Sequence, residues 1–345
     1  MDAQNIQSAP VITKETKNKI RVEFERTPLI ERLKTKFISM YFLTNVAWYL
    51  FRLILLIGVS FVILYPFVAK IAGSFMQYED FVDATVRLVP KHFTLEQYKY
   101  IFLELSYMQA LINTATVSLI NALLQTFVSC LIGYGLSKFK FKGNKLIFLL
   151  VIITMVIPHE TIRLSLYMKF RYFDIFGIFQ AITGNPIGGS SGLLNTYWPL
   201  VLLSATGLAF KNGLYIFMMR QFFTGVPDEL EESAYVDGSG KFRNFIQIIL
   251  PLSIPMMITI FLFAFSWQWT DEFYTNLFIT SNKIILMPDI LAIPESLEIA
   301  GAGAATYNAA IYNTCGLMII APLVILYLFC QRYLVQGIER SGLVG

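Results

Sequence analysis

The stretch "ELEESAYVDGSGKFRNFIQIILPLSIP", residues 229–255, carries the pattern that decides the fold. Its segment GSGK, residues 238–241, looks like the end of a phosphate-binding loop, whose pattern G-x-x-x-x-G-K-[ST] cradles phosphate and holds magnesium. Tyr235 stands where the first glycine belongs, and Phe242 stands where Ser or Thr is required. The dinucleotide pattern G-x-G-x-x-G fails as well, because its third glycine would fall on Arg243. The stretch is therefore not a nucleotide site.

The composition is that of a membrane protein. Of the 345 residues, 56% are hydrophobic and 14% are charged, and the mean hydropathy is +0.59. These values lie outside the range of ordinary soluble domains. The net charge of +4 comes largely from a basic N-terminal segment, so it indicates membrane topology and not nucleic-acid binding. Residues 1–46 lack the apolar region of a signal peptide, and we expect them to be retained in the cytoplasm.

The sequence contains no pattern typical of a catalytic or metal site. Cys130, Cys315 and Cys330 lie in apolar runs without paired or metal-ligand spacing, which favours simple packing over disulfides or zinc. The two histidines are His92 and His159, and neither H-E-x-x-H nor G-x-S-x-G occurs. We therefore expect a chain that is not an enzyme and binds no cofactor or metal of its own.

Six apolar stretches are long enough to cross a bilayer, which takes about 20 residues of helix. They predict an all-α polytopic membrane protein with three parts: a basic N-terminal segment (1–50), a six-span domain (51–335) and a C-terminal tail (336–345). An even number of spans would place both termini on one side. The predicted spans are residues 52–69, 111–136, 146–166, 197–223, 245–269 and 314–333.

The distribution of basic residues predicts the orientation. Lysines and arginines are concentrated before the first span, and lysines fill the connection between spans two and three. The positive-inside rule then places both termini and this connection in the cytoplasm. Lys169 and Arg171 would lie outside, in a longer connection where the rule has less force. The connection between spans four and five, residues 221–244, would be cytoplasmic.

This connection predicts two helices separated by glycine. Pro227 suits a first helical position, and Asp228 and Glu229 suit the positive end of the helix dipole. Gly238 is placed to end the helix in a left-handed conformation. Ser239 is the predicted N-cap of a second helix that continues into span five.

The same connection carries five acidic residues on a loop predicted to face the cytoplasm. Leu230 and Ala234 lie one helical turn apart and would form a small apolar ridge, exposed unless a partner covers it. On pattern alone, a solvated loop and a protein-docking site both stay open. The acidic residues are Asp228, Glu229, Glu231, Glu232 and Asp237.

Residues 229–255 resemble the EAA loop of permease subunits of binding-protein-dependent ABC importers, in which E-A-A-x-x-D-G-A is followed after a spacer by I-x-L-P-L. Ser233 replaces an alanine of that pattern, and Gly240 occupies a position that usually has a larger side chain. Other segments resemble the smaller six-span permeases of the maltose-type carbohydrate group over residues 53–345. These are IFMMRQFF (216–223), WQWTDEF (267–273), MVIPHE (155–160) and the tail QRYLVQGIERSGLVG (331–345).

The resemblance implies that the short helix is a coupling helix seated in a groove of a cytoplasmic ATPase subunit. Leu230, Ala234 and Tyr235 would be contact surface, and Glu232 would anchor by charge or hydrogen bonds. ATP and magnesium would belong to that partner, and ATP-driven closure would push the helix together with span five. The ATPase-coupling residues implied are Leu230, Glu232, Ser233, Ala234, Tyr235, Asp237, Gly238, Leu250 and Pro251.

The resemblance also implies a function and an assembly. The chain would form half of the translocation pathway for a sugar or oligosaccharide delivered by an external binding protein. Its partners would be a second homologous permease in a heterodimer, two ATPase subunits and the binding protein, in a bacterial plasma membrane. An ion-coupled secondary transporter is the alternative. It would be expected to show internal repeats with an acidic residue at mid-depth, which the sequence lacks.

Polar residues inside the spans mark a candidate pathway. Span two carries a polar seam on one face, which fits either hydrogen bonding between helices or pathway lining. The seam consists of Thr114, Ser118, Asn121, Gln125 and Ser129. Span four, read as one helix, places Tyr197, Ser204, Lys211 and Tyr215 on one face, with the charge of Lys211 near mid-membrane. Snorkelling or an ion pair is the alternative for Lys211.

Two further groups lie toward the outer ends of spans three and five. His159, Glu160 and Arg163 follow a proline, and Glu160 and Arg163 are spaced to pair; a lone histidine here favours an ordinary hydrogen bond. Trp267 and Trp269 suit interfacial anchoring or, alternatively, sugar stacking. The candidate pathway residues are Ser118, Asn121, Gln125, Lys211, Tyr215, Trp267 and Trp269.

Overall fold

The computed structural model describes residues 14–15, 19–20, 40–174, 177–184, 187–281 and 283–342. Most of the N-terminal segment predicted at residues 1–50 and the end of the predicted tail lie outside these ranges. The chain divides into two compact units, Met1–Phe67 and Val68–Gly345. A short antiparallel ladder pairs β1 (Lys14–Glu15) with β2 (Lys19–Ile20) in the first unit.

Four helices are long and apolar enough to cross a membrane, and they contain predicted spans one, two, five and six. An all-helical membrane fold follows from them, because a backbone in lipid must satisfy its hydrogen bonds internally. They are Thr44–Gly73 within α2 (Met40–Gly73), α5 (Tyr107–Lys138), Lys241–Trp269, and Ala304–Tyr333 within α15 (Ala304–Gly342). The third of these joins α12 (Lys241–Asn244), the π-helix η3 (Phe245–Ile249) and α13 (Leu250–Trp269).

The third predicted span is bent. Helix α6 (Asn144–Val156) and the segment formed by η1 (His159–Ile162) and α7 (Arg163–Arg171) meet at 97°. The residue before a proline is disfavoured in the helical region, and Ile157 before Pro158 is extended with ψ 121°. Counted as one span, the bent pair raises the number of candidate spans to five.

The fourth predicted span is interrupted. The structure forms α9 (Trp198–Ala205) and α10 (Asn212–Thr224), with irregular backbone between them. Gly207 and Lys211 have left-handed backbone angles, φ +74° and φ +66°. The prediction of one continuous helix at residues 197–223 is therefore wrong, and so is the single polar face assigned to it. The segment SATGLAFKNG, residues 204–213, does contain turn signals at Gly207 and at Asn212-Gly213.

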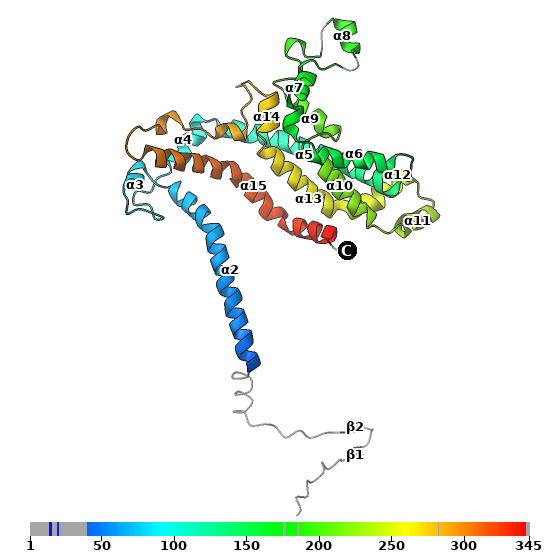
Figure 1. Cartoon of the computed structure of the whole chain (residues 1–345), viewed down its shortest axis with the longest axis horizontal. Helices are drawn as coiled ribbons and strands as arrows, with labels where there is room; N and C mark the ends of the chain where they lie inside the picture. Colours follow the sequence, from blue (N-terminus) through cyan, green and yellow to red (C-terminus); the bar gives the residue numbers. More distant parts are fainter. Residues whose placement is uncertain are drawn as a thin grey trace, which may run out of the picture. The chain divides into compact units, whose positions relative to one another are not determined.

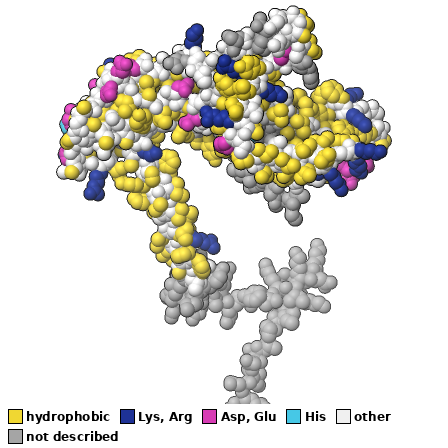
Figure 2. All heavy atoms as spheres, turned by 45° about the horizontal axis from the view of Figure 1, so that its top comes forward, with side chains coloured by type: hydrophobic (Ala, Val, Ile, Leu, Met, Phe, Trp, Pro, Cys, Tyr) yellow, Lys and Arg dark blue, Asp and Glu magenta, His cyan; other side chains and the backbone are white. Residues whose placement is uncertain are grey.

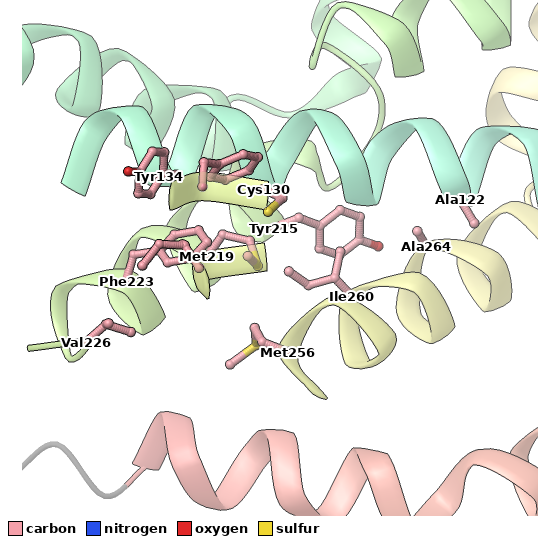
Figure 3. Packing of buried hydrophobic residues seen from close by; sticks show 12 residues of the cluster. Ala122, Cys130, Tyr134, Tyr215, Met219, Phe223, Val226, Met256, Ile260 and Ala264 are labelled. Carbon is pink, nitrogen blue, oxygen red and sulfur yellow. The ribbon is translucent and has the colours of Figure 1, made fainter. Parts of the chain in front are cut away.

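Helix α5 lies at the centre of the second unit. It packs against α9, α10 and α13, and α13 packs in turn against α15 (Figure 1). A cluster of buried apolar side chains fills the space between α5, α10 and α13, and Figure 3 shows it running from Tyr134 to Ala122 and Ala264. The helices approach closely at Gly133, where a β-carbon would lie 2.6 Å from the β-carbon of Met219.

Short helices occupy the connections. Buried Gln97 holds α4 (Glu96–Glu104) in place. It donates to the carbonyl of Met76 at 3.0 Å and accepts from the Thr314 hydroxyl at 2.6 Å. These elements are α3 (Tyr78–Val82), α4 (Glu96–Glu104), α8 (Ile178–Thr183), η2 (Gly189–Ser191), α11 (Glu229–Val236), α14 (Phe273–Phe278), η4 (Met287–Ile290) and η5 (Glu295–Leu297).

Replacing Gly133 by alanine is expected to lower the stability of the protein. Its new β-carbon would lie 2.6 Å from the β-carbon of Met219 and 2.9 Å from the backbone nitrogen of Arg220. Such overpacking costs roughly 1–3 kcal/mol. The matched control is Gly135→Ala on the same helix, which meets nothing within 4 Å and should be neutral or stabilising. Thermal unfolding in detergent checks both, and equal midpoints would contradict the close packing of α5 on α10.

Candidate functional site

Helix α11 ends in the way the sequence predicts. Gly238 has φ +81°. The N–H of Ser239 donates to the carbonyl of Ala234 at 2.9 Å, and the N–H of Gly238 donates to that of Tyr235 at 3.0 Å. These two bonds form a Schellman motif, which satisfies carbonyls at the helix end and needs a residue that tolerates left-handed backbone. The prediction for Gly238 is confirmed.

Two details of the predicted helix starts are wrong. Helix α12 begins after Gly240, whose backbone is extended (φ −77°, ψ 159°), and not after Ser239. The N–H of Ser239 is committed to ending α11, so this residue belongs to the preceding helix end. Asp228 takes the N-cap position of α11, because its carbonyl accepts the N–H groups of Glu231 and Glu232 at 3.0 Å. Pro227 therefore precedes the helix.

Helix α11 is tied to the end of α5 by two polar contacts. The Tyr134 hydroxyl donates to the Glu231 carboxylate at 2.8 Å, and Glu231 is only 7% exposed. The Lys138 ammonium donates to Asp228 at 2.5 Å and to the carbonyl of Val226 at 2.6 Å. The hydrogen bond and charge of Lys138 lower the pKa of Asp228. The sequence analysis did not identify Tyr134 as a partner of this loop. Glu231 and Ala234 are both buried and lie at i,i+3 spacing, so they form the inward face of α11.

Apolar and acidic side chains are exposed around the buried face of α11. Ala234 is buried within this chain, so the predicted exposed ridge of Leu230 and Ala234 is wrong. Leu230 is exposed together with Tyr235, Val236 (87%) and, at the start of the next helix, Phe242 (77%). Large exposed apolar side chains on one short element indicate a surface that a partner covers. Figure 2 shows charged side chains gathered where α11 and α12 lie.

The remaining predicted coupling residues lie on or near this loop. Glu232, Ser233 and Asp237 are exposed. Leu250 packs on the cluster between α5, α10 and α13, whereas Pro251 is exposed and lies just after the π-helical segment η3, where a residue without an N–H cannot bond the preceding helical turn. The loop and the start of α13 thus share one end of the second unit.

The polar seam of α5 is buried throughout. The hydroxyl of Thr114 accepts the N–H of Met287 at 2.8 Å, and the amide of Asn212 donates to the Ser129 hydroxyl at 3.3 Å. Asn121 donates to Gln268 at 3.2 Å, and Gln125 donates to Ser204 at 3.2 Å. Hydrogen bonding between elements is therefore confirmed for these four seam residues. Ser118 is buried, and its hydroxyl has no partner among the described residues.

A pocket lies beside this seam, where α5, α9, α13 and α14 meet. Amide, hydroxyl and carboxylate groups line it together with three aromatic rings, and the break between α9 and α10 forms part of its wall. The lining residues are Gln125, Leu200, Leu203, Ser204, Ala209, Phe210, Ala264, Trp267, Gln268, Asp271 and Tyr274. Burial raises the pKa of Asp271, whose carboxylate accepts the N–H of Thr275 at 2.8 Å.

Lys211 lies next to two of the lining rings. Its ammonium is 4.5 Å from the centre of the Phe210 ring and 4.9 Å from that of the half-exposed Trp267. Such cation–π contacts stabilise a partly desolvated ammonium. The described residues contain no ion pair between Lys211 and a carboxylate. Lys211 lies in the break, directly before α10, and not within the continuous helix that the sequence predicted.

The outer group of span three also meets this region. His159 shares a hydrogen bond with the hydroxyl of Tyr274, as the ordinary interpretation of a lone histidine predicts. The predicted pairing of Glu160 with Arg163 is not among the ion pairs of the described residues. The Arg163 guanidinium lies instead over the ring of Phe273 at 5.9 Å.

Two candidate pathway residues lie in packed positions. Tyr215 is 1% exposed within the cluster between α5, α10 and α13. Trp269 is 2% exposed, and its indole N–H donates to the carbonyl of Ile319 in α15 at 2.9 Å. Neither residue lines the pocket. Among the described residues, no three His, Cys, Asp or Glu side chains are grouped to hold a metal ion.

Comparisons with known proteins point to one kind of transport protein. Residues 125–340 match the family described as "Binding-protein-dependent transport system inner membrane component". The galactooligosaccharides transport system permease protein GanQ of Bacillus subtilis is 27% identical over 304 residues, covering 86% of this chain and 95% of GanQ. The maltodextrin transport system permease protein MalD of Streptococcus pneumoniae is 27% identical over 292 residues, covering 83% and 92%.

The fold has a counterpart among solved structures. A crystal structure of a bacterial ABC transporter involved in the import of the acidic polysaccharide alginate superposes with a TM-score of 0.63 and 18% identity. The match covers 84% of this chain and 97% of the other. The matched family segment, residues 125–340, begins within α5 and includes α11 and α13.

Proposed function

Because the chain belongs to the family of binding-protein-dependent transport system inner membrane components, we propose that it forms half of an oligosaccharide pathway in a bacterial inner membrane. It is a permease subunit of an ABC importer, and ATP hydrolysis belongs to a partner chain. The single observation that carries the proposal further is α11, a short helix fastened to α5 on one face, with Val236 and Glu232 exposed on the opposite face and Leu230 and Tyr235 partly exposed at its edges.

In this proposal α11 is the coupling helix. The exposed apolar side chains of α11, Leu230, Tyr235 and Val236, together with Phe242 at the start of α12, contact the ATPase subunit. Glu232 and Asp237 lie exposed on the same element and meet polar or basic groups at the edge of this contact. Buried Ala234 contributes by packing α11 on its own chain. A helix held on one side by its own protein can transmit a push received on the other.

The assembly contains further partners. A second homologous permease completes a heterodimer, two ATPase subunits bind ATP and magnesium, and an external binding protein delivers the sugar. The chain crosses the membrane six times if the bent pair α6–α7 and the interrupted pair α9–α10 each count as one span. Both termini, including residues 1–50 and the tail 336–345, then face the cytoplasm with the loop at residues 227–251, as the lysines between spans two and three support.

The pocket supports a sugar substrate. The partly exposed amide of Gln268 can exchange hydrogen bonds with sugar hydroxyls, and the face of half-exposed Trp267 can stack on a sugar ring, whereas buried Gln125 and Ser204 are bonded to each other. Lys211 beside Trp267 adds a fixed cation. The relatives whose names specify galactooligosaccharides and maltodextrins support an oligosaccharide. Ser118, Asn121, Tyr215 and Trp269 contribute from packed positions behind the lining.

Gly238→Pro or Glu232→Lys is expected to abolish uptake while the chain still inserts in the membrane. Proline fixes φ near −65°, which is incompatible with the φ of +81° at Gly238, and lysine reverses the charge of an exposed anchor. Gly240→Ala is the control, because Gly240 has φ −77° and open space around it. Uptake of labelled oligosaccharide, normalised to membrane content of the chain, measures the effect. Normal uptake by Gly238→Pro would contradict the coupling role.

Trp267→Ala is expected to reduce oligosaccharide uptake about tenfold, because an aromatic contact of up to about 1.5 kcal/mol is lost. Trp198→Ala is the matched control, since Trp198 is similarly exposed (57% against 50%) and does not line the pocket. Initial uptake rates at subsaturating sugar measure both variants. An equal loss in the two would contradict the assignment of the pocket to the pathway.

A further inference from the structure

The two polar contacts between α11 and α5 differ in burial, because Glu231 is buried whereas the side chain of Asp228 is 75% exposed. Tyr134 is 5% exposed, and its ring packs against those of Phe223 at 5.5 Å and Phe245 at 4.8 Å. Its hydroxyl is thereby held in one position toward Glu231. One turn further along α5, the side chain of Lys138 is 6% exposed and binds Asp228. We call these two contacts, Tyr134–Glu231 and Lys138–Asp228, the α5 latch.

From the latch, α5 leads directly to the pocket. The helix is continuous over 32 residues, from Tyr107 to Lys138. Its residue Gln125 lines the pocket and donates to Ser204 of α9, another lining residue. One turn further, Asn121 donates to the lining residue Gln268. A displacement of α11 that the latch transmits would therefore reach two walls of the pocket through one helix.

The covalent route from α11 to the pocket is less regular than α5. It passes through the left-handed turn at Gly238 and then through η3, a π-helical segment at Phe245–Ile249. Such segments are irregularities of an α-helix and often occur at functional sites. Asn244, directly before η3, is fully buried, and both polar atoms of its side chain lack a partner among the described residues. This route therefore has two departures from regular α-helix, whereas α5 is α-helical throughout.

We propose that α5, through the latch, is the main mechanical connection between the coupling helix and the pocket, and that Tyr134 and Lys138 are its positioning residues. The proposal rests on the coupling function proposed for α11. It assigns to η3 the role of a joint that lets the start of span five follow α11 without fixing its angle. The side chain of Glu231, turned away from the ATPase, is the receiving end of the connection.

The test follows a reporter cysteine in the pocket. The importer is purified with its own ATPase subunits, carrying Ala209→Cys in the pocket wall and Cys330→Ser to remove a partly exposed thiol. The probe is a charged maleimide. Its labelling rate is measured without nucleotide and after trapping with MgATP and vanadate, and trapped nucleotide per complex is measured in parallel. With an intact latch, we expect the two rates to differ at least fivefold.

Tyr134→Phe, which removes only the hydroxyl, and Lys138→Met are expected to bring the ratio of labelling rates close to one. Lys138→Arg should retain the response, because arginine can also bind Asp228. Ser137→Ala is the control on the same turn of α5, since its hydroxyl contacts Thr224 of α10 and not α11. It should leave the ratio unchanged.

A double variant separates coupling from stability. Tyr134→Phe with Glu231→Met replaces both partners by apolar groups, which avoids a buried unpaired carboxylate and should restore the unfolding temperature. We expect the labelling ratio of the double variant to stay near one. A full response in Tyr134→Phe or in the double variant would overturn the α5 connection and leave the importer function standing. A wild-type pocket that ignores nucleotide, or a complex without ATPase subunits, would overturn both.

Discussion

Backbone polar groups within a bilayer must find their partners inside the protein, and this constraint decides where the chain is helical and where it stops. Four long helices satisfy it directly. The interruption between α9 and α10 lies where its residues Ala209 and Phe210 form the wall of a pocket. Irregular backbone is tolerated at such a cavity, because polar groups can be satisfied there. The constraint that makes the protein helical therefore also locates the candidate pathway.

The same reasoning applies to side chains. The polar groups of α5 are buried and are mostly paired across to neighbouring elements, which fixes that helix relative to α9 and α13. At the charged end, buried Glu231 requires a donor and finds it in Tyr134 of α5. The inner face of α11 thus belongs to the packing of the protein, and its outer face is left for a partner. The coupling role proposed for α11 requires this division, with one face fixed to its own chain and the other free to contact a partner.

Local features were predictable from the sequence, and contacts between distant residues were not. Gly238 was identified correctly because a helix end with left-handed backbone strongly favours glycine. The start of the next helix was misplaced by one residue. The N–H of Ser239 bonds to α11, and the carbonyl of Gly240 accepts the first bond of α12, which the sequence alone does not show. The Tyr134–Glu231 bond joins residues 97 positions apart, and no local pattern specifies it. The break before Lys211 was missed although Gly207 and the pair Asn212-Gly213 signal a turn, because the apolar residues on both sides were counted as one span.

The central claim is that this permease couples to a separate ATPase through α11. The most direct measurement is ATP hydrolysis by the complex purified through this chain in mild detergent, with and without an oligosaccharide-loaded external binding protein. Our account predicts that ATPase subunits co-purify and that the loaded binding protein stimulates their hydrolysis several-fold. A well-folded chain that purifies without ATPase subunits and supports no stimulated hydrolysis would contradict it.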